Sequence, residues 1–298
     1  MPTKPRVLIL ANMKKPPVIQ AIEEFGPWLQ ERAEIVAVMD TWETRDGFDV
    51  EPPECDLTLV LGGDGTFLSQ ARVMVDRKVP LLGVNFGKVG FLAEFEIEDV
   101  KEHWDTIICG DCRRTQRVMM DVDVMPLGTP QWDGDGVQPD RAYIAMNDAV
   151  VTAGPPFRMI EMDVAIEPDV SHQSALRFAG DGIIVATASG STAYNLSVGG
   201  PIVSPGVDGL VVSAIAPQSI AFRPIVFNAE CDVWLTMVRA NEGTTLVIDG
   251  QESIAIQEGQ QIRIRRHPNR LSLIQNPKRT YWKMLSHKMH WAVRPSRT

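Results

Sequence analysis

The sequence has few cysteines and no long apolar run, and these two features limit the classes of protein to which it can belong. Only 4 of the 298 residues are cysteine. Cys109 and Cys112 form a lone C-x-x-C pair without the further ligands that a structural zinc site needs. No apolar stretch approaches the roughly 20 residues of a membrane-spanning helix, and the N-terminus lacks the apolar core of a signal peptide. We therefore expect a protein of the cytoplasm with no membrane partner.

Positive charge is also scarce. Lys and Arg number 29 against 38 Asp and Glu, which gives a formal net charge of −9. A nucleic-acid-binding face needs clustered basic residues, so this balance argues against nucleic acid as a partner. An anionic cofactor is compatible with it, because backbone N–H groups at a helix N-terminus bind phosphate without basic side chains. Hydrophobic residues make up 44% of the chain, enough for large buried cores.

The hydrophobic pattern changes near residue 113 and predicts two domains. In the first third, short apolar strands alternate with helical stretches such as residues 18–32, which is typical of a parallel sheet covered on both faces. From Val118 onward, period-two stretches such as residues 159–166 predict many short strands. The expected organisation is an α/β, Rossmann-like domain at 1–113, an all-β, sandwich-like domain at 114–274, and a tail at 275–298 that packs back on the first domain.

The strongest chemical signal is a glycine-rich turn after an apolar strand. Residues 57–61 run into Gly62-Gly63-Asp64-Gly65-Thr66 and then into helical spacing. Glycines let the backbone approach a phosphate, and a helix N-terminus adds N–H groups and the positive end of a dipole. We interpret the turn as a phosphate site in which Asp64 accepts a proton from an attacking hydroxyl or helps to hold a metal. A tight turn in which Asp64 only caps the helix is the alternative.

Two further segments have the composition of a nucleoside site. Small residues and hydroxyl groups cluster over 180–201 around Tyr194, and such a surface lets a planar base or a ribose approach closely. The Asn147-Asp148 pair follows an apolar strand, and an amide beside a carboxylate suits ribose hydroxyls. By itself the pair is more typical of a turn, since Asn and Asp favour turns.

In this order and at this spacing, the motifs resemble those of the NAD kinase family. The resemblance rests on residues 62–66, Asn147-Asp148, the 180–201 segment and Asp249-Gly250-Gln251, and it covers nearly the whole chain. It implies a phosphofructokinase-like first domain and ATP-dependent phosphorylation of the adenosine-ribose 2′-hydroxyl of NAD. It also implies ATP as phosphoryl donor, a divalent metal, usually magnesium, and a homodimer or homotetramer.

Carried over position by position, the resemblance makes Asp64 the catalytic proton acceptor for the 2′-hydroxyl. The glycines around it would face phosphates, and no residue is assigned to the metal itself. The implied cofactor-binding residues are Gly62, Gly63, Asp64, Gly65, Thr66, Asn147, Asp148, Arg158, Asp181, Thr192, Ala193, Tyr194, Asn195, Leu196, Ser197, Ala216 and Gln251.

Two other functions stay open at this level. A lipid or sphingoid-base kinase could use the same glycine-rich turn, with an apolar acyl pocket and a membrane-facing surface; the acidic balance and the hydroxyl-rich 180–201 segment argue against it. A non-catalytic NAD(P)-binding regulator could share the fold. The intact Asp64 with its glycines argues against that function.

Overall fold

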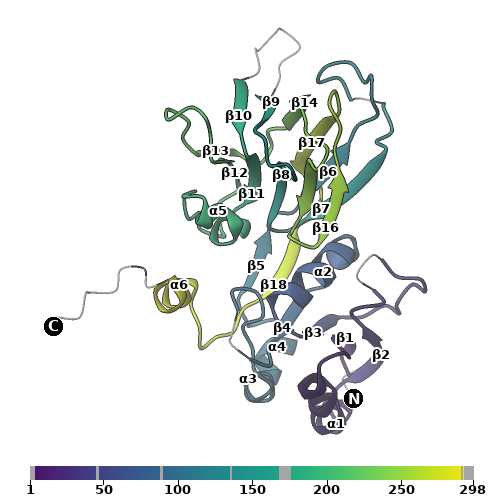
Figure 1. Ribbon diagram of the computed structural model, residues 1–298. Helices are drawn as coiled ribbons and strands as arrows, with labels where there is room; N and C mark the ends of the chain where they lie inside the picture. The colour runs from purple at the N-terminus through teal and green to yellow at the C-terminus, as the bar shows by residue number, and fades with distance from the viewer. Residues whose placement is uncertain are drawn as a thin grey trace, which may run out of the picture. The chain divides into compact units, whose positions relative to one another are not determined.

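Figure 1 shows the computed structural model of the chain, which describes residues 4–44, 47–87, 90–134, 136–167, 176–289 and 291. The chain divides into two compact units. The N-terminal unit comprises Met1–Gln116 and Leu271–Thr298, and the β unit comprises Arg117–Arg270.

A six-stranded sheet in the order β2-β1-β3-β4-β18-β5 forms the centre of the N-terminal unit. The pairings from β2 across to β18 are parallel. Because parallel sheets are covered on both faces, their strands are buried throughout, as β3 is over its whole length. The strands are β1 (Arg6–Ala11), β2 (Glu34–Asp40), β3 (Leu57–Leu61), β4 (Leu81–Val84), β5 (Arg114–Arg117) and β18 (Leu271–Ile274).

Helices cover both faces of this sheet. On one face, Ile9 and Leu59 share a core with Phe25 of α1 and with buried residues of α3 and α4. On the other face, Phe67 of α2 lies against Gly83 of β4, where a Cβ would meet its ring at 2.9 Å. Burial of a side chain of this size stabilises a fold by about 1.5–3 kcal/mol. The helices are α1 (Pro16–Gln30), α2 (Asp64–Met74), the 3₁₀ helix η1 (Val75–Arg77), α3 (Ile97–Glu102) and α4 (Trp104–Ile108).

The chain returns to the N-terminal unit through β18. The sequence placed residues 271–274 in the second domain, but Leu273 pairs in parallel with Leu81 of β4. After β18 the chain continues into α6 (Tyr281–Met289), whose Met284 and Leu285 are buried. Residues 290 and 292–298 of the tail expected at 275–298 lie outside the described residues.

Asn276, directly after β18, is held by a buried polar network. Its Nδ2 donates to the Glu94 carbonyl at 3.2 Å and to Asp99 Oδ2 at 2.9 Å, and its Oδ1 accepts the Lys278 N–H at 2.9 Å. Lys278 Nζ lies 3.3 Å from Asp99 Oδ1. These contacts fix the returning segment beside α3.

Asn276→Ala should therefore lower the free energy of unfolding by about 2–4 kcal/mol, because it removes three hydrogen bonds of a buried amide, one of them to a carboxylate. Urea denaturation checks this. Gln20→Ala, which removes an exposed amide bonded to Glu24 on α1, is the matched control and should change stability by less than about 0.5 kcal/mol. Equal stability of the two variants would contradict the structural role of Asn276.

Two six-stranded sheets pack face to face in the β unit, in the orders β10-β9-β14-β17-β6-β7 and β13-β12-β11-β8-β15-β16. We call them the first and second sheets of this unit. Their inner faces share one core, to which Met162 and Leu235 contribute from the first sheet and Val151 and Val185 from the second. The prediction of an α/β domain followed by a β-sandwich domain is confirmed.

The strands of the first sheet are β6 (Met120–Val124), β7 (Arg141–Ala145), β9 (Ile160–Ile166), β10 (Leu176–Gly180), β14 (Val233–Arg239) and β17 (Gln261–Arg266). Those of the second sheet are β8 (Asp148–Thr152), β11 (Gly182–Thr187), β12 (Gly209–Ile215), β13 (Ile225–Asn228), β15 (Thr245–Ile248) and β16 (Glu252–Ala255).

The second sheet is covered on its outer face by an irregular segment that follows β11. This segment contains the 3₁₀ helix η2 (Gly190–Thr192) and the single-turn α5 (Tyr194–Ser197). Ala188 and Val203, within and after it, pack with Val150 and Val211 of the sheet. In the part of the chain that the structure describes, no helix combines the length and apolar character needed to cross a bilayer.

Candidate active site

The glycine-rich turn joins the end of β3 to the start of α2. The helix begins at Asp64, and Gly63 is its extended N-cap residue. Residue 62 must be glycine, because a Cβ there would lie 2.6 Å from the Cβ of Thr66. The first turn of a helix directs N–H groups and the positive end of its dipole outward. Such a turn presents N–H groups at the carboxyl edge of the parallel sheet, a position where anions can bind.

Two asparagines that the sequence-based site did not include lie beside this turn. Asn12 follows β1, and its Nδ2 donates to Thr66 Oγ1 at 3.3 Å. Asn85 follows β4, and its Oδ1 lies 3.9 Å from the position of a Cβ on Gly63. Both residues come directly after a parallel strand, which is the positional signal that could have identified them.

The carboxylate of Asp64 accepts three backbone hydrogen bonds from the loop after β4. Phe91 N–H donates to Oδ2 at 2.9 Å, and the N–H groups of Leu92 and Ala93 donate to Oδ1 at 3.2 and 3.0 Å. A Cβ on Gly90 would lie only 1.6 Å from Oδ1, so glycine is required there. A carboxylate has about four acceptor positions. The bonds found among the described residues thus leave one acceptor position on Oδ2.

The Asp64 carboxylate therefore holds the loop after β4 in place and not the first turn of its own helix, α2. Its side chain makes no capping hydrogen bond to α2 and instead fixes residues 91–93. Asp64 is thus structurally engaged with the loop after β4 and is not the helix cap of the alternative interpretation.

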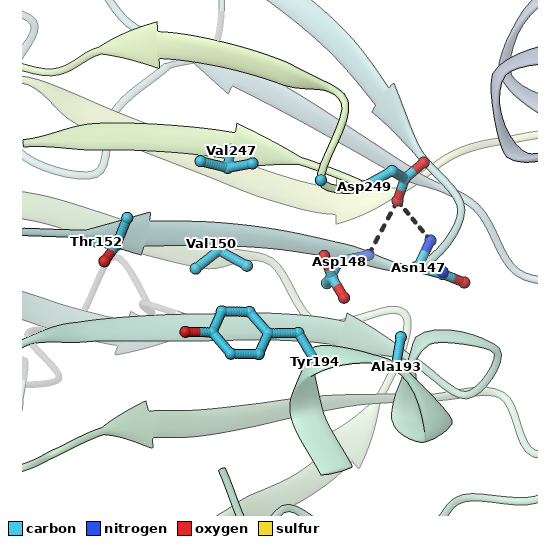
Figure 2. A pocket seen from close by; sticks show the side chains of 9 residues that line it. Asn147, Asp148, Val150, Thr152, Ala193, Tyr194, Val247 and Asp249 are labelled. Atoms are coloured by element: carbon cyan, nitrogen blue, oxygen red, sulfur yellow. Dashed lines mark hydrogen bonds between the residues drawn. The ribbon is translucent and has the colours of Figure 1, made fainter. Parts of the chain in front are cut away.

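A pocket of about 360 Å³ lies on the outer face of the second sheet of the β unit (Figure 2). Its volume falls in the range of small-molecule sites. Val150 and Val247 give it an apolar floor, and the ring of Tyr194 lies across from Val150. The lining residues are Asn147, Asp148, Val150, Thr152, Ala193, Tyr194, Val247, Asp249 and Gly250.

Two carboxylates meet at the polar end of this pocket. Asp148 is buried, and Asp249 is 8% exposed. Burial and, second, the neighbouring charge of Asp249 raise the pKa of Asp148 to about 7, whereas the backbone N–H of Tyr194 lowers it. Asp148 therefore changes its charge near neutral pH, and the pocket changes its hydrogen-bonding character with it.

The segment after β11 is docked closely on residues 146 and 147. Thr187 Oγ1 donates to the Met146 carbonyl at 2.6 Å and accepts the Gly190 N–H at 3.1 Å. A Cβ on Gly190 would lie 2.0 Å from the Asn147 carbonyl oxygen. This close approach brings Ala193 and Tyr194 to the pocket.

Asn195, expected to bind the cofactor, is buried and is not among the pocket-lining residues. It is 0% exposed, and its Nδ2 donates to the carbonyls of Ser191 and Pro201 at 3.1 and 3.0 Å. Its Oδ1 accepts the Ser213 hydroxyl at 2.7 Å. With its amide engaged on both sides, Asn195 ties the segment to β12 and does not line the pocket.

The other expected residues of the β unit are described by the structure and lie outside the lining of this pocket. Asp181 lies beyond the Thr152 end of β8, where its carbonyl accepts the Ala153 N–H at 2.8 Å, and its N–H donates to the Ile215 carbonyl next to Ala216. The residues outside the lining are Arg158, Asp181, Thr192, Leu196, Ser197, Ala216 and Gln251.

Among the described residues, no group of three or more His, Cys, Asp or Glu side chains is placed to hold a metal ion. Magnesium in phosphoryl-transfer sites is usually bound by one or two carboxylates together with substrate phosphates. A cation that depends on substrate phosphates in this way needs no such cluster.

Comparison with known proteins identifies the family. A model described as the ATP-NAD kinase N-terminal domain matches residues 29–112, and one described as the ATP-NAD kinase C-terminal domain matches residues 146–276. An NAD kinase of Rhodopirellula baltica is 31% identical over 97% of this chain and 88% of its own length. An NAD kinase of Geotalea daltonii is 32% identical over 97% of this chain and 99% of its own.

Two solved structures share the fold. Yeast NADH kinase complexed with NADH aligns with a TM-score of 0.81 at 20% identity, covering 100% of this chain and 91% of the yeast chain. An NAD kinase from Archaeoglobus fulgidus in complex with ATP aligns with a TM-score of 0.65 at 24% identity, covering 92% and 94%. At these identities the likeness concerns the fold alone. From the two domain models and the relatives that span nearly its full length, the chain belongs to the NAD kinase family.

Proposed function

We propose that the protein transfers the γ-phosphoryl group of ATP to the adenosine-ribose 2′-hydroxyl of NAD, with NADP and ADP as products. Family membership over nearly the whole chain supports this activity. The observation that carries the chemistry is the carboxylate of Asp64. It sits at the start of a helix and is held by three backbone N–H groups, and the described residues leave one acceptor position on Oδ2.

The reaction in this proposal is a direct in-line transfer. The glycine-rich turn receives phosphates, and most of the rate enhancement comes from positioning and electrostatic stabilisation. Asp64 Oδ2 orients the 2′-hydroxyl and takes its proton as the bond to phosphorus forms. General-base catalysis of this kind is worth about 10²–10⁴ in rate, or about 3–5 kcal/mol. Magnesium would accompany ATP as its counter-ion.

The pocket of the β unit is proposed to hold part of the dinucleotide. Asn147 and Asp148 would hydrogen-bond ribose hydroxyls, since they combine an amide with a carboxylate at its polar end. Tyr194 and Val150 would contact the planar part of the nucleoside. The residues outside the pocket lining, Asp181 and Ala216 among them, stay proposed contacts.

A homodimer or homotetramer of the cytoplasm is also proposed. The exposed edge strand β13 supports self-association, because Ile225 and Val226 are 49% and 46% exposed there and an unpaired edge is a template for another strand. Size-exclusion chromatography with light-scattering detection should give the mass of a dimer or tetramer. A monomer mass at micromolar concentration would overturn this part of the proposal.

A substrate panel tests the activity. The wild-type protein is incubated with ATP and magnesium and with NAD, NADH or sphingosine as acceptor, and the products are identified by mass spectrometry. We expect NADP with an equal amount of ADP in the NAD reaction. Phosphorylated sphingosine without NADP would favour the lipid kinase. NAD binding without any phosphorylated product would favour the non-catalytic regulator.

Gly190→Ala should weaken NAD binding by about tenfold or more, because the added Cβ would lie 2.0 Å from the Asn147 carbonyl and must displace the 146–148 backbone. Calorimetric titration with NAD measures this. Gly206→Ala is the matched control, since a Cβ there meets no atom within 4 Å and the residue lies in the same unit. Equal NAD affinity of the two variants would contradict the proposed binding site.

A further inference from the structure

Asp249 is a charged pocket residue outside the residues that the sequence assigned to the site. It lies in the turn between β15 and β16 in the left-handed conformation, with φ of 51°. Asp and Asn are the non-glycine residues that adopt this conformation most readily. The unusual backbone places the side chain against a different part of the chain, about a hundred residues earlier in the sequence.

The Asp249 carboxylate accepts hydrogen bonds from three consecutive backbone N–H groups. Met146 N–H donates to Oδ2 at 3.0 Å, and the N–H groups of Asn147 and Asp148 donate to Oδ1 at 2.7 and 3.1 Å. Figure 2 shows the bonds to Asn147 and Asp148 as dashed lines. Hydrogen bonds to an ionised acceptor are roughly twice as strong as neutral ones.

These bonds fall at a corner of the fold. β7 ends at Ala145 in the first sheet, and β8 begins at Asp148 in the second, so the chain changes sheets at residues 146 and 147. Backbone N–H groups at such a corner leave the ladder of one sheet before they join the next. A buried N–H needs a partner, and Asp249 supplies it for three in a row.

The carbonyl groups of the same corner are held as well. Thr187 Oγ1 donates to the Met146 carbonyl at 2.6 Å, and Thr187 N–H donates to the Asn147 carbonyl at 2.9 Å. Asp249 N–H donates to the Asp148 carbonyl at 2.9 Å. With donors and acceptors both satisfied, these bonds hold the corner in the conformation in which Asn147 and Asp148 line the pocket.

We propose that Asp249 is a positioning residue for dinucleotide recognition, which fixes the corner at residues 146–148 so that Asn147 and Asp148 meet the ribose hydroxyls. This inference rests on the proposed function. Asp249 acts through the corner backbone, and the ligand contacts are made by the residues that the corner presents.

The charge of Asp249 also gives the proposal a pH signature. Among the described residues that line the pocket, the other ionisable side chains are Asp249, from the turn after β15, and Tyr194, from α5. Asp249 is one of the causes that raise the pKa of Asp148 to about 7. Removal of its charge should move the acid limb of NAD binding, where Asp148 takes up a proton, to lower pH.

Asp249→Asn tests the proposal, with NAD and ATP affinities measured by calorimetry between pH 5.5 and 8.5. We expect NAD affinity to fall about 10- to 100-fold, because the amide NH₂ replaces one acceptor oxygen. ATP affinity should stay near the wild-type value, and the acid limb should move to lower pH. Asp208→Asn, which removes an exposed, ion-paired carboxylate of the same unit, should change none of these.

Asp249→Glu keeps the proposal testable if the asparagine variant does not fold. Glutamate retains the charge, but its longer side chain moves the carboxylate away from the position that accepts the three N–H bonds. This variant should therefore weaken NAD binding and leave the acid limb near its wild-type position. Wild-type NAD affinity and pH profile in Asp249→Asn, or an equal loss of NAD and ATP affinity, would overturn the proposal alone. A wild-type protein that neither binds NAD nor forms NADP would overturn the proposed function and this inference with it.

Discussion

Asp64→Asn should reduce the turnover number by about 10²–10⁴-fold at saturating NAD and ATP. The amide keeps the shape of the side chain but cannot take the proton of the 2′-hydroxyl. It can keep one oxygen toward the N–H groups of Leu92 and Ala93. Its NH₂ group would then face the N–H of Phe91, which loses its acceptor.

The same substitution should therefore also destabilise the N-terminal unit, by about 2 kcal/mol for a lost bond to a charged acceptor. This second effect needs its own control, because a partly unfolded enzyme also turns over slowly. Asn276→Ala is suited to it, since it weakens the same unit and leaves the Asp64 carboxylate in place. Its turnover number, per folded molecule, should stay close to that of wild type.

The comparison separates chemistry from stability. If Asp64→Asn turned over like Asn276→Ala once both were corrected for the folded fraction by urea denaturation, Asp64 would only hold the 91–93 loop. NAD affinity is a second readout. The open acceptor position contributes mainly to the transition state, so affinity should change much less than turnover.

Asp148→Asn should stabilise the β unit above pH 7 while weakening NAD binding. The pKa of Asp148 rises from 3.8 to about 7 on folding, mainly through burial and then through Asp249. Between these values the folded state keeps a proton that the unfolded state has released. The stability linked to this group is thus fully present below about pH 4 and is lost as the pH rises through 7.

The loss amounts to about 4 kcal/mol, from about three pKa units at about 1.4 kcal/mol each. An amide cannot ionise, so the variant avoids it. Urea denaturation at pH 5 and pH 8 should show a stabilisation of this order at pH 8 and a much smaller one at pH 5. Asp208→Asn, whose carboxylate pairs with Arg270 on the surface, should show no gain at pH 8. A gain of equal size at both pH values would contradict the ionisation of Asp148.

The two domains could be predicted from the sequence because each has its own hydrophobic periodicity. Strand–helix alternation and period-two strands differ over long stretches, and the structure has an α/β unit and a β-sandwich unit. The destination of Leu271–Ile274 could not be read in this way. Its alternating pattern resembles that of the preceding β strands, and only the tertiary pairing with β4 places it in the N-terminal unit.

In the candidate site, too, local features could be predicted from the sequence and long-range contacts could not. The glycine-rich turn was located from its sequence because glycine and helix-start signals are local. The bonds that hold the carboxylates of Asp64 and Asp249 come from backbone N–H groups of distant residues, which carry no side-chain signature. Asn195 was assigned to the site from the sequence, but its amide is buried and supports the segment structurally. A polar residue within a binding motif can have either role.

The position of the new phosphate on the product tests the proposed reaction most directly. Product from the wild-type reaction with NAD, ATP and magnesium is purified and its phosphate located by phosphorus and proton NMR. The proposed mechanism predicts a single monoester at the adenosine-ribose 2′-oxygen, formed in equal amount with ADP. A phosphate at any other hydroxyl, or ADP without a phosphorylated dinucleotide, would contradict it.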